Sequence, residues 1–232
     1  NNKSLITLEL PERLVEVKNN FLMGSNSLQS IVITPLNNSF TTLDGVLYDK
    51  NKNKIIIYPE GKIDSNFIVP NTVSYINKHA FFSSKYLKSI DLKYTQVVLD
   101  EAFIDCKQLY SINAISLSTS KSNAFFGTKW LENSGDKAVL GKTLIQYKGT
   151  EELIDASIIT PNIKYIGEFA FSNSPATSIV IPEYVIELGL NALAKINNLE
   201  NIYIMGQTDF NDKIFGETRY TDIKIGVLLA RF

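Results

Sequence analysis

The sequence predicts a right-handed solenoid, α/β to mainly β, in which coils of about 22–23 residues stack on one another. Three observations lead to this prediction: apolar residues recur with that period, apolar and polar residues alternate late in each period, and prolines recur near its start. A single coil of this length cannot bury its own apolar face, so stacking is what removes these side chains from water. The repeat itself therefore supplies the core.

The repeat is clearest between residues 73 and 114. When Val73 is numbered zero, apolar residues occupy offsets 3, 7, 8, 14, 17 and 19, and the copy that starts at Thr95, 22 residues later, has apolar residues at the same offsets. One extra coil fits the 46-residue interval between the copies that start at Leu117 and Ile163. The other copies start at Leu14, Leu117, Ile163 and Val185.

Each coil contains two local patterns. An Ala-Phe pair such as Ala80-Phe81 predicts a short helical turn, with the small residue allowing close contact between coils. The period-2 alternation over residues 87–92 predicts a strand whose neighbours are the same strand of adjacent coils, hence a parallel β-ladder. We expect one continuous core to contain Leu87, Ile90, Leu92, Phe103, Leu109, Ile112, Phe171, Leu199 and Ile202.

Two insertions interrupt the period, at about 40–61 and about 132–149. Apolar runs flank a polar tip in the first, which predicts that residues 45–49 pair antiparallel with 54–58. A second hairpin is expected over about 138–147. A degraded last copy predicts a capping turn over about 206–232, and residues 1–232 are expected to form a single solenoid domain.

Composition limits the partners and the chemistry. The chain has 23 Lys and Arg against 24 Asp and Glu, so nothing favours nucleic acid or an anionic membrane. The longest apolar runs are far shorter than the roughly 20 residues of a membrane helix, so no membrane insertion is expected. Cys106 is the only cysteine, which excludes an intrachain disulfide framework and cysteine-based metal clusters.

Two segments carry a resemblance to a known family. Residues 163–171 and 101–109 are similar to the unit of the BspA-type leucine-rich repeat family, and both insertions look like hairpins of that family. The resemblance implies a leucine-rich repeat solenoid in a secreted or cell-surface protein, often an adhesin, whose repeats face host or neighbouring-cell proteins. Thr95 and Ser120 depart from the pattern because they replace apolar residues.

Catalytic chemistry has few candidates. His79 is the only histidine and lacks the partners of a catalytic constellation, so we interpret it as a surface or boundary residue. Cys106 occupies a position typical of small core filler. No calcium, phosphate, zinc or nucleophile-elbow spacing occurs, so we expect a non-enzymatic protein with no catalytic, cofactor-binding or metal-binding residues.

The outward positions of the ladder form the candidate partner surface. Such a surface is extended, rigid and chemically mixed, as in solenoids that bind proteins, although plain sheet surface is the alternative. Another possible contact is the basic tip at residues 50–54, which could meet an acidic partner. The candidate residues are Ser89, Asp91, Lys93, Ser111, Asn113, Ile115, Asn201, Tyr203 and Met205.

Three functions remain open. The first is a protein-binding module of a secreted or cell-surface protein, active in adhesion or host-protein recognition, with a partner such as an extracellular-matrix or host surface protein. The second is a structural spacer or oligomerisation scaffold that carries another domain. An enzyme built in the inserted hairpins is the weakest. Exposed apolar residues gathered along the ladder would favour binding of a protein partner. Exposed apolar residues gathered on an open end coil would favour end-to-end assembly of copies of this chain.

Overall fold

The computed structural model describes residues 2–18, 20–210, 212–216 and 224–228. The chain divides into two compact units, Asn1–Leu117 with Lys121–Asn133, and Ser118–Ser120 with Ser134–Phe232. Both units consist of short strands joined by turns, as the coil pattern predicts. The prediction of a single domain over 1–232 stays a prediction.

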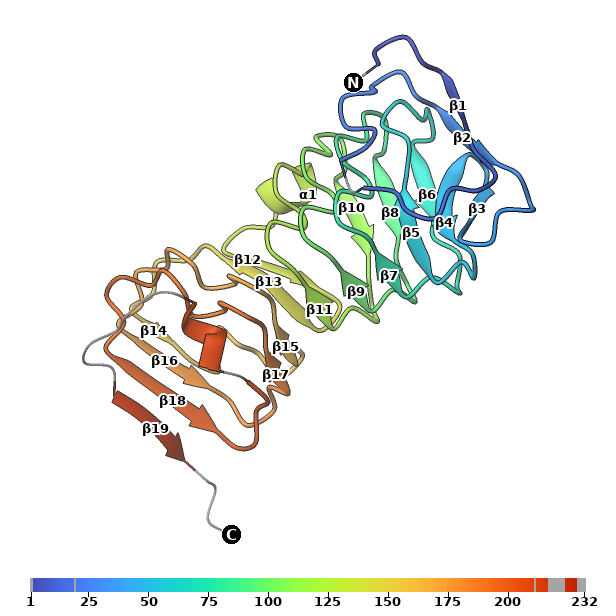
Figure 1. Ribbon diagram of the computed structural model, residues 1–232. Coiled ribbons are helices and arrows are strands. Elements are labelled where there is room, and N and C mark those ends of the chain that lie inside the picture. Colours follow the sequence, from blue (N-terminus) through green and yellow to red (C-terminus); the bar gives the residue numbers. More distant parts are fainter. Residues whose placement is uncertain (1, 19, 211, 217–223, 229–232) are drawn as a thin grey trace. The chain divides into compact units, whose positions relative to one another are not determined.

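The first unit contains parallel strands that repeat from coil to coil (Figure 1). Strand β8 lies between β6 and β10 in one parallel sheet, β7 lies between β5 and β9 in another, and β1 pairs with β2. The parallel ladder expected from the alternating pattern is thus confirmed. The bounds are β1 Thr7–Leu10, β2 Ser30–Ile33, β5 Lys54–Ile57, β6 Asn66–Ile68, β7 Tyr75–Ile76, β8 Ser89–Asp91, β9 Val97–Val98 and β10 Ser111–Asn113.

The second unit repeats the same plan. One sheet has the order β12-β13-β15-β17 and another the order β14-β16-β18-β19, with every pair except β12–β13 parallel. Of the predicted capping turn, residues 206–210, 212–216 and 224–228 are described, and the last of these form β19. The bounds are β11 Thr119–Ser120, β12 Lys137–Leu140, β13 Thr143–Tyr147, β14 Leu153–Ile154, β15 Tyr165–Ile166, β16 Ser178–Ile181, β17 Glu187–Leu188, β18 Asn201–Met205, the 3-10 helix η1 Asp212–Phe215, and β19 Lys224–Leu228.

Both inserted hairpins are confirmed. Strand β4 (Val46–Asp49) pairs antiparallel with β5 and also with β3 (Phe40–Leu43), and β12 pairs antiparallel with β13. Asp44 and Gly45 join β3 to β4 with φ of 49° and 77°, the left-handed pair that a tight two-residue hairpin requires. The second strand of each hairpin also belongs to a parallel ladder, so the insertions extend the sheets.

The Ala-Phe segments are turns closed by hydrogen bonds between residues three apart. Phe82 N–H donates to the His79 carbonyl, and Ser84 N–H donates to the Phe81 carbonyl. Residues with left-handed backbone conformation flank these segments. Because a right-handed helix requires negative φ at every residue, the turns do not continue as α-helix. The flanking pairs are His79 and Ser83, Glu101 and Asp105, Asn123 and Gly127, Phe169 and Asn173, and Asn191 and Lys195.

The predicted burial is confirmed for eight of the nine residues. Five of them are buried in the first unit and three in the second: Leu87, Ile90, Leu92, Phe103 and Leu109, then Phe171, Leu199 and Ile202. The prediction was wrong for Ile112, which is half-buried. Ile112 lies in β10, the last strand of its sheet, so a neighbouring strand covers it on one side only.

An aromatic column runs through the core of the first unit. The rings of Tyr58, Phe81, Phe103 and Phe125 stack in succession, with centroids 4.8, 4.7 and 5.3 Å apart. Trp130 closes the column with an edge contact to Phe125 at 5.5 Å. Trp130 lies in α1 (Lys129–Glu132), which begins at the N-cap Thr128. Stacking of one ring per coil fixes the register between coils.

The polar departures Thr95 and Ser120 are buried rather than exposed, as is Thr208 near the start of a later coil. Thr95 Oγ1 donates to the Val73 carbonyl at 3.4 Å, and Thr208 Oγ1 donates to the Val185 carbonyl at 3.0 Å. A buried hydroxyl costs little free energy when it is hydrogen-bonded. Threonine is therefore tolerated at the start of a coil because the preceding coil supplies an acceptor.

Candidate protein-binding surface

The outward side chains of β6, β8 and β10 form two rows across the first unit. Asp91 lies between Ile68 and Asn113 in register, and Ser89 lies between Asn66 and Ser111. Asp91 and Ser89 on the central strand are half-buried. Their outward-facing neighbours on β6 and β10 are exposed. The row formed by Ile68, Asp91 and Asn113 is called the Ile68–Asp91–Asn113 row.

Hydrogen bonds hold these side chains in place. Ser89 Oγ donates to Asn66 Oδ1 at 2.6 Å, and Asn113 Nδ2 donates to Asp91 Oδ1 at 3.0 Å. The backbone N–H of Lys93 donates to the same Asp91 oxygen at 3.0 Å. The polar groups of neighbouring coils are thus ordered before any partner arrives, which lowers the entropic cost of binding.

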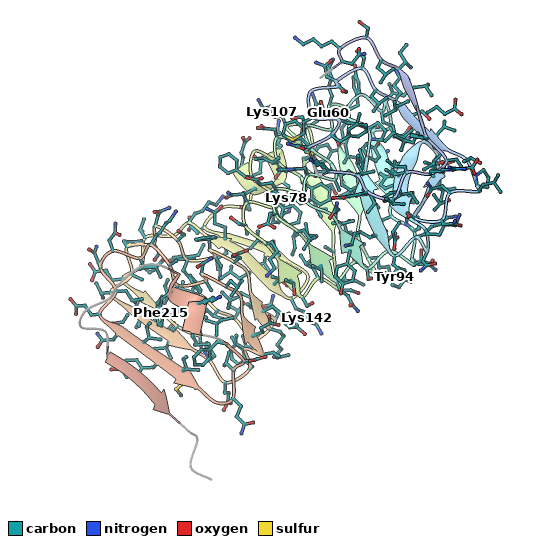
Figure 2. All side chains as sticks on the ribbon, in the orientation of Figure 1. Glu60, Lys78, Tyr94, Lys107, Lys142 and Phe215 are labelled. Carbon is teal, nitrogen blue, oxygen red and sulfur yellow. The ribbon has the colours of Figure 1, made fainter. Side chains whose placement is uncertain are left out.

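Lys93 does not neutralise Asp91. Its Nζ lies 5.2 Å from the ring centroid of Tyr94, an exposed residue at the margin of the first unit (Figure 2). Among the residues that the structure describes, Asp91 forms no ion pair. The row therefore presents a carboxylate without a counter-ion.

The strand β6 was not predicted from the repeat pattern. Ile68 is 77% exposed although it is a large aliphatic residue, and it stands directly beside Asp91. The signal was present, because Phe67 and Val69 precede Ile90 and Leu92 by 23 residues. The insertion before β6 obscured it.

The remaining candidates lie in the second unit. Asn201 Nδ2 donates to Ser178 Oγ at 3.2 Å, and Tyr203 lies in register between Val180 and Gly226. All three predicted side chains of β18 are half-buried. The structure therefore brings Ser89, Asp91, Ser111 and Asn113 together in one sheet, and it places Asn201, Tyr203 and Met205 in another. Lys93 and Ile115, both exposed, follow the strands β8 and β10.

Two lysine side chains at the basic tip of the first hairpin make contacts within the chain. Lys50 Nζ donates to the carbonyl oxygens of Pro35 and Asn37. Lys54 Nζ lies 5.7 Å from the ring centroid of Tyr75. Two of the three lysines of the tip, Lys50 and Lys54, are thus held by contacts within the chain.

His79 and Cys106 have separate partners. His79 Nε2 lies 2.6 Å from Glu101 Oε2, and this hydrogen bond holds the pKa of Glu101 below its usual value. The Cys106 thiol is buried and donates to the Phe81 carbonyl at 2.9 Å, while burial raises its pKa to about 12. A thiol with so high a pKa is a poor nucleophile at neutral pH.

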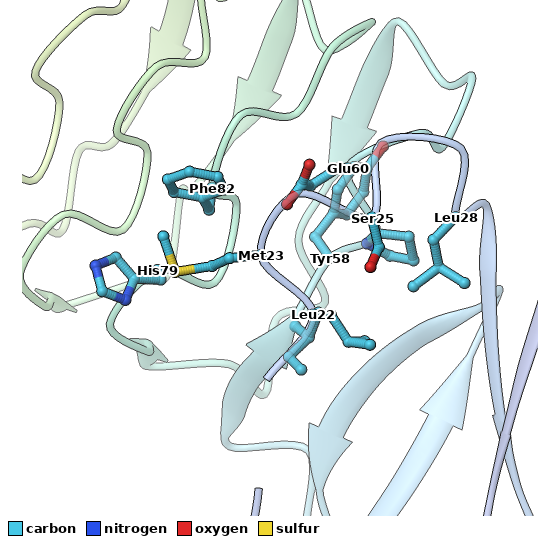
Figure 3. Close-up of a pocket in the computed structure, with 10 residues that line it drawn as sticks. Leu22, Met23, Ser25, Leu28, Tyr58, Glu60, His79 and Phe82 are labelled. Atoms are coloured by element: carbon cyan, nitrogen blue, oxygen red, sulfur yellow. The ribbon is translucent and has the colours of Figure 1, made fainter. Parts of the chain in front are cut away.

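A small pocket lies between the loop at residues 22–28, residues 57–60 and the turn that contains His79 and Phe82 (Figure 3). Met23 extends toward His79 on one side of it, and Glu60 and Tyr58 line the other. Glu60 Oε1 accepts the N–H of Gly24 at 2.6 Å, and burial of the carboxyl raises its pKa. The carboxyl of Glu60 thus fastens the loop to the coil.

Neither a metal centre nor a membrane span is evident in the described part of the chain. No group of three or more His, Cys, Asp or Glu side chains there is placed to hold a metal ion. No helix in the same residues is long and apolar enough to cross a bilayer.

Comparison with known proteins identifies the family. The model of the BspA type leucine rich repeat region matches residues 61–135 and 147–231 with six copies, so the chain belongs to this family. The pneumococcal vaccine antigen PcpA is 22% identical with a TM-score of 0.55, over 97% of this chain and 51% of that one. A leucine rich cell surface protein from Faecalibacterium prausnitzii A2-165 is 23% identical with a TM-score of 0.52, over 88% of this chain and 49% of that one.

These two structures share the fold with this chain, which spans about half the length of each. A search of curated proteins finds no match. The resemblance seen in the repeat is confirmed at the level of the family.

Proposed function

We propose that this chain is a protein-binding repeat region of a secreted or cell-surface protein, and that it acts in adhesion or host-protein recognition without catalysis. The contact surface in this proposal is the outward side of the β6, β8 and β10 ladder. The observation that carries it is the 77% exposed Ile68 beside the counter-ion-free Asp91 on a rigid sheet.

Three further observations support the proposal. Exposed large apolar residues accompany the ladder, since Ile115, two residues after the end of β10, is 54% exposed. The side chains on the sheet are ordered by hydrogen bonds between coils. The name of one structural neighbour describes it as a cell surface protein, and that of another as a vaccine antigen.

Binding to individual purified proteins tests the proposal. The full chain is immobilised and exposed in turn to purified extracellular-matrix and serum proteins. A ladder variant carries Ile68→Ser, Asp91→Asn and Asn113→Ser. A matched control carries Tyr75→Ser and Val97→Asn on the outward positions of the other parallel ladder of the same unit.

We expect capture of at least one of these proteins and a loss of about tenfold or more in affinity for the ladder variant only, as for residues near the centre of an interface. Loss in the control alone would contradict the proposal. Absence of any capture, together with self-association in analytical ultracentrifugation, would favour the scaffold function instead.

A further inference from the structure

We propose that the Ile68–Asp91–Asn113 row receives an arginine side chain of the protein partner. The inference rests on the proposed function and adds the chemistry of recognition to it. The partner of the first unit would then expose an arginine that contacts the centre of the ladder.

The carboxylate of Asp91 is positioned to accept a cation. Its Oδ1 is occupied by Asn113 Nδ2 and by the Lys93 N–H, both at 3.0 Å. These two donors fix the rotamer and leave Oδ2 with no partner among the described residues. Lys93, whose backbone N–H donates to Asp91, places its ammonium group 5.2 Å from the Tyr94 ring centroid instead.

A second acceptor stands beside the first. Asn113 donates through Nδ2, and its Oδ1 accepts no hydrogen bond within the described part of the chain. Asp91 and Asn113 are register partners on adjacent strands, about 4.8 Å apart. Two neighbouring oxygen acceptors suit the planar fork of a guanidinium better than the point charge of an ammonium group.

Ile68 supplies the apolar part of the site. It pairs in register with Asp91 from β6, on the side of β8 away from Asn113, and is 77% exposed. Long basic side chains lay their methylene stems on apolar surface while the charged head stays polar. An arginine whose stem lies on Ile68 would place its head at Asp91 and Asn113, so the three residues together match one side chain.

The test uses the isotope-labelled full chain and NMR titration with a defined probe. The probe is a short Gly-Ser peptide with one central arginine. Matched peptides carry citrulline, a neutral isostere of arginine, or lysine at that position. Protein variants are Asp91→Asn, Ile68→Ser and, as a control that removes one exposed carboxylate in the second unit, Glu200→Gln.

We expect saturable shift changes confined to β6, β8 and β10 with the arginine peptide, weaker ones with lysine and none with citrulline. Asp91→Asn should weaken binding at least about fivefold and Ile68→Ser about twofold or more, with Glu200→Gln unchanged. Equal response to citrulline, or insensitivity to Asp91→Asn, would overturn the inference. If no peptide binds while the ladder variant still loses protein capture, the arginine site is refuted and the proposed function stands.

Discussion

The ring of Tyr203 lies over the α-carbon of Gly226 in the adjacent strand. A Cβ on Gly226 would stand 2.8 Å from Tyr203 Cδ1 and 3.1 Å from Cε1, so the ring would have to shift to admit a larger residue. Gly226 lies in β19, the end strand of its sheet, and an aromatic ring over a glycine is a known way of stabilising such a strand. Tyr203, predicted as a contact residue, therefore also packs within the sheet.

This relationship predicts coupling between the two residues. Gly226→Ala should destabilise the chain by about 1 kcal/mol because the ring must move. The cost should shrink when Tyr203→Ala is already present, with an interaction energy of about 0.5–1 kcal/mol. Urea unfolding of the two single variants and the double variant measures it, and additive effects would contradict the packing.

Glu60 predicts a pH-dependent stability. Burial raises its pKa in the folded state, so the folded chain holds the proton more tightly than the unfolded chain. That contribution is present in full below the unfolded pKa, near 4.5, and is lost as pH rises through the raised value. Glu60→Gln cannot ionise and keeps an oxygen acceptor for the Gly24 N–H.

The Gln variant should therefore be more stable than the parent at pH 7, with a smaller difference at pH 4. Urea midpoints at the two values provide the measurement. A variant that is destabilised equally at both would mean that burial does not penalise the Glu60 carboxylate.

The aromatic column predicts a large effect at its centre. Phe103→Ala should cost about 3–5 kcal/mol, because the ring is fully buried between Phe81 and Phe125. Phe126→Ala is a matched control, since that ring is 59% exposed and should change stability by less than about 0.5 kcal/mol. Trp130, the only tryptophan, reports unfolding by fluorescence. Similar costs at the two positions would contradict the column.

The left-handed turn positions predict a stabilising substitution. Ser83 has φ of 48°, which strains an ordinary residue and suits glycine. Ser83→Gly should stabilise the chain by about 0.5–1 kcal/mol, whereas Ser74→Gly, outside the left-handed region, should destabilise it by a similar amount. Thermal unfolding compares them, and the same sign at both positions would show that backbone strain does not decide the outcome.

Local patterns carried most of the fold prediction. The period-2 alternation at Leu87–Leu92 and the apolar runs around residues 50–53 each involve residues close together in the sequence. The sequence pattern therefore predicted the ladder and the first hairpin directly. Burial of Ile112 was overestimated because the sequence does not reveal that β10 ends its sheet.

The candidate site was harder to predict because its contacts join different coils. The hydrogen bond from Asn113 to Asp91 spans 22 residues and depends on register, which the offsets implied only in part. Ile68 was missed because the insertion before it broke the count. The ring of Tyr203 over Gly226 depends on the pairing of β18 with β19, which a degraded repeat conceals.

The central claim is that the β6, β8 and β10 ladder contacts the partner, and hydroxyl-radical footprinting of the captured complex tests it most directly. We expect the oxidation rates of Ile68 and Ile115 to fall several-fold in the complex while that of Tyr75, on the other parallel ladder, stays unchanged. Protection of Tyr75 with Ile68 still fully reactive would contradict the claim.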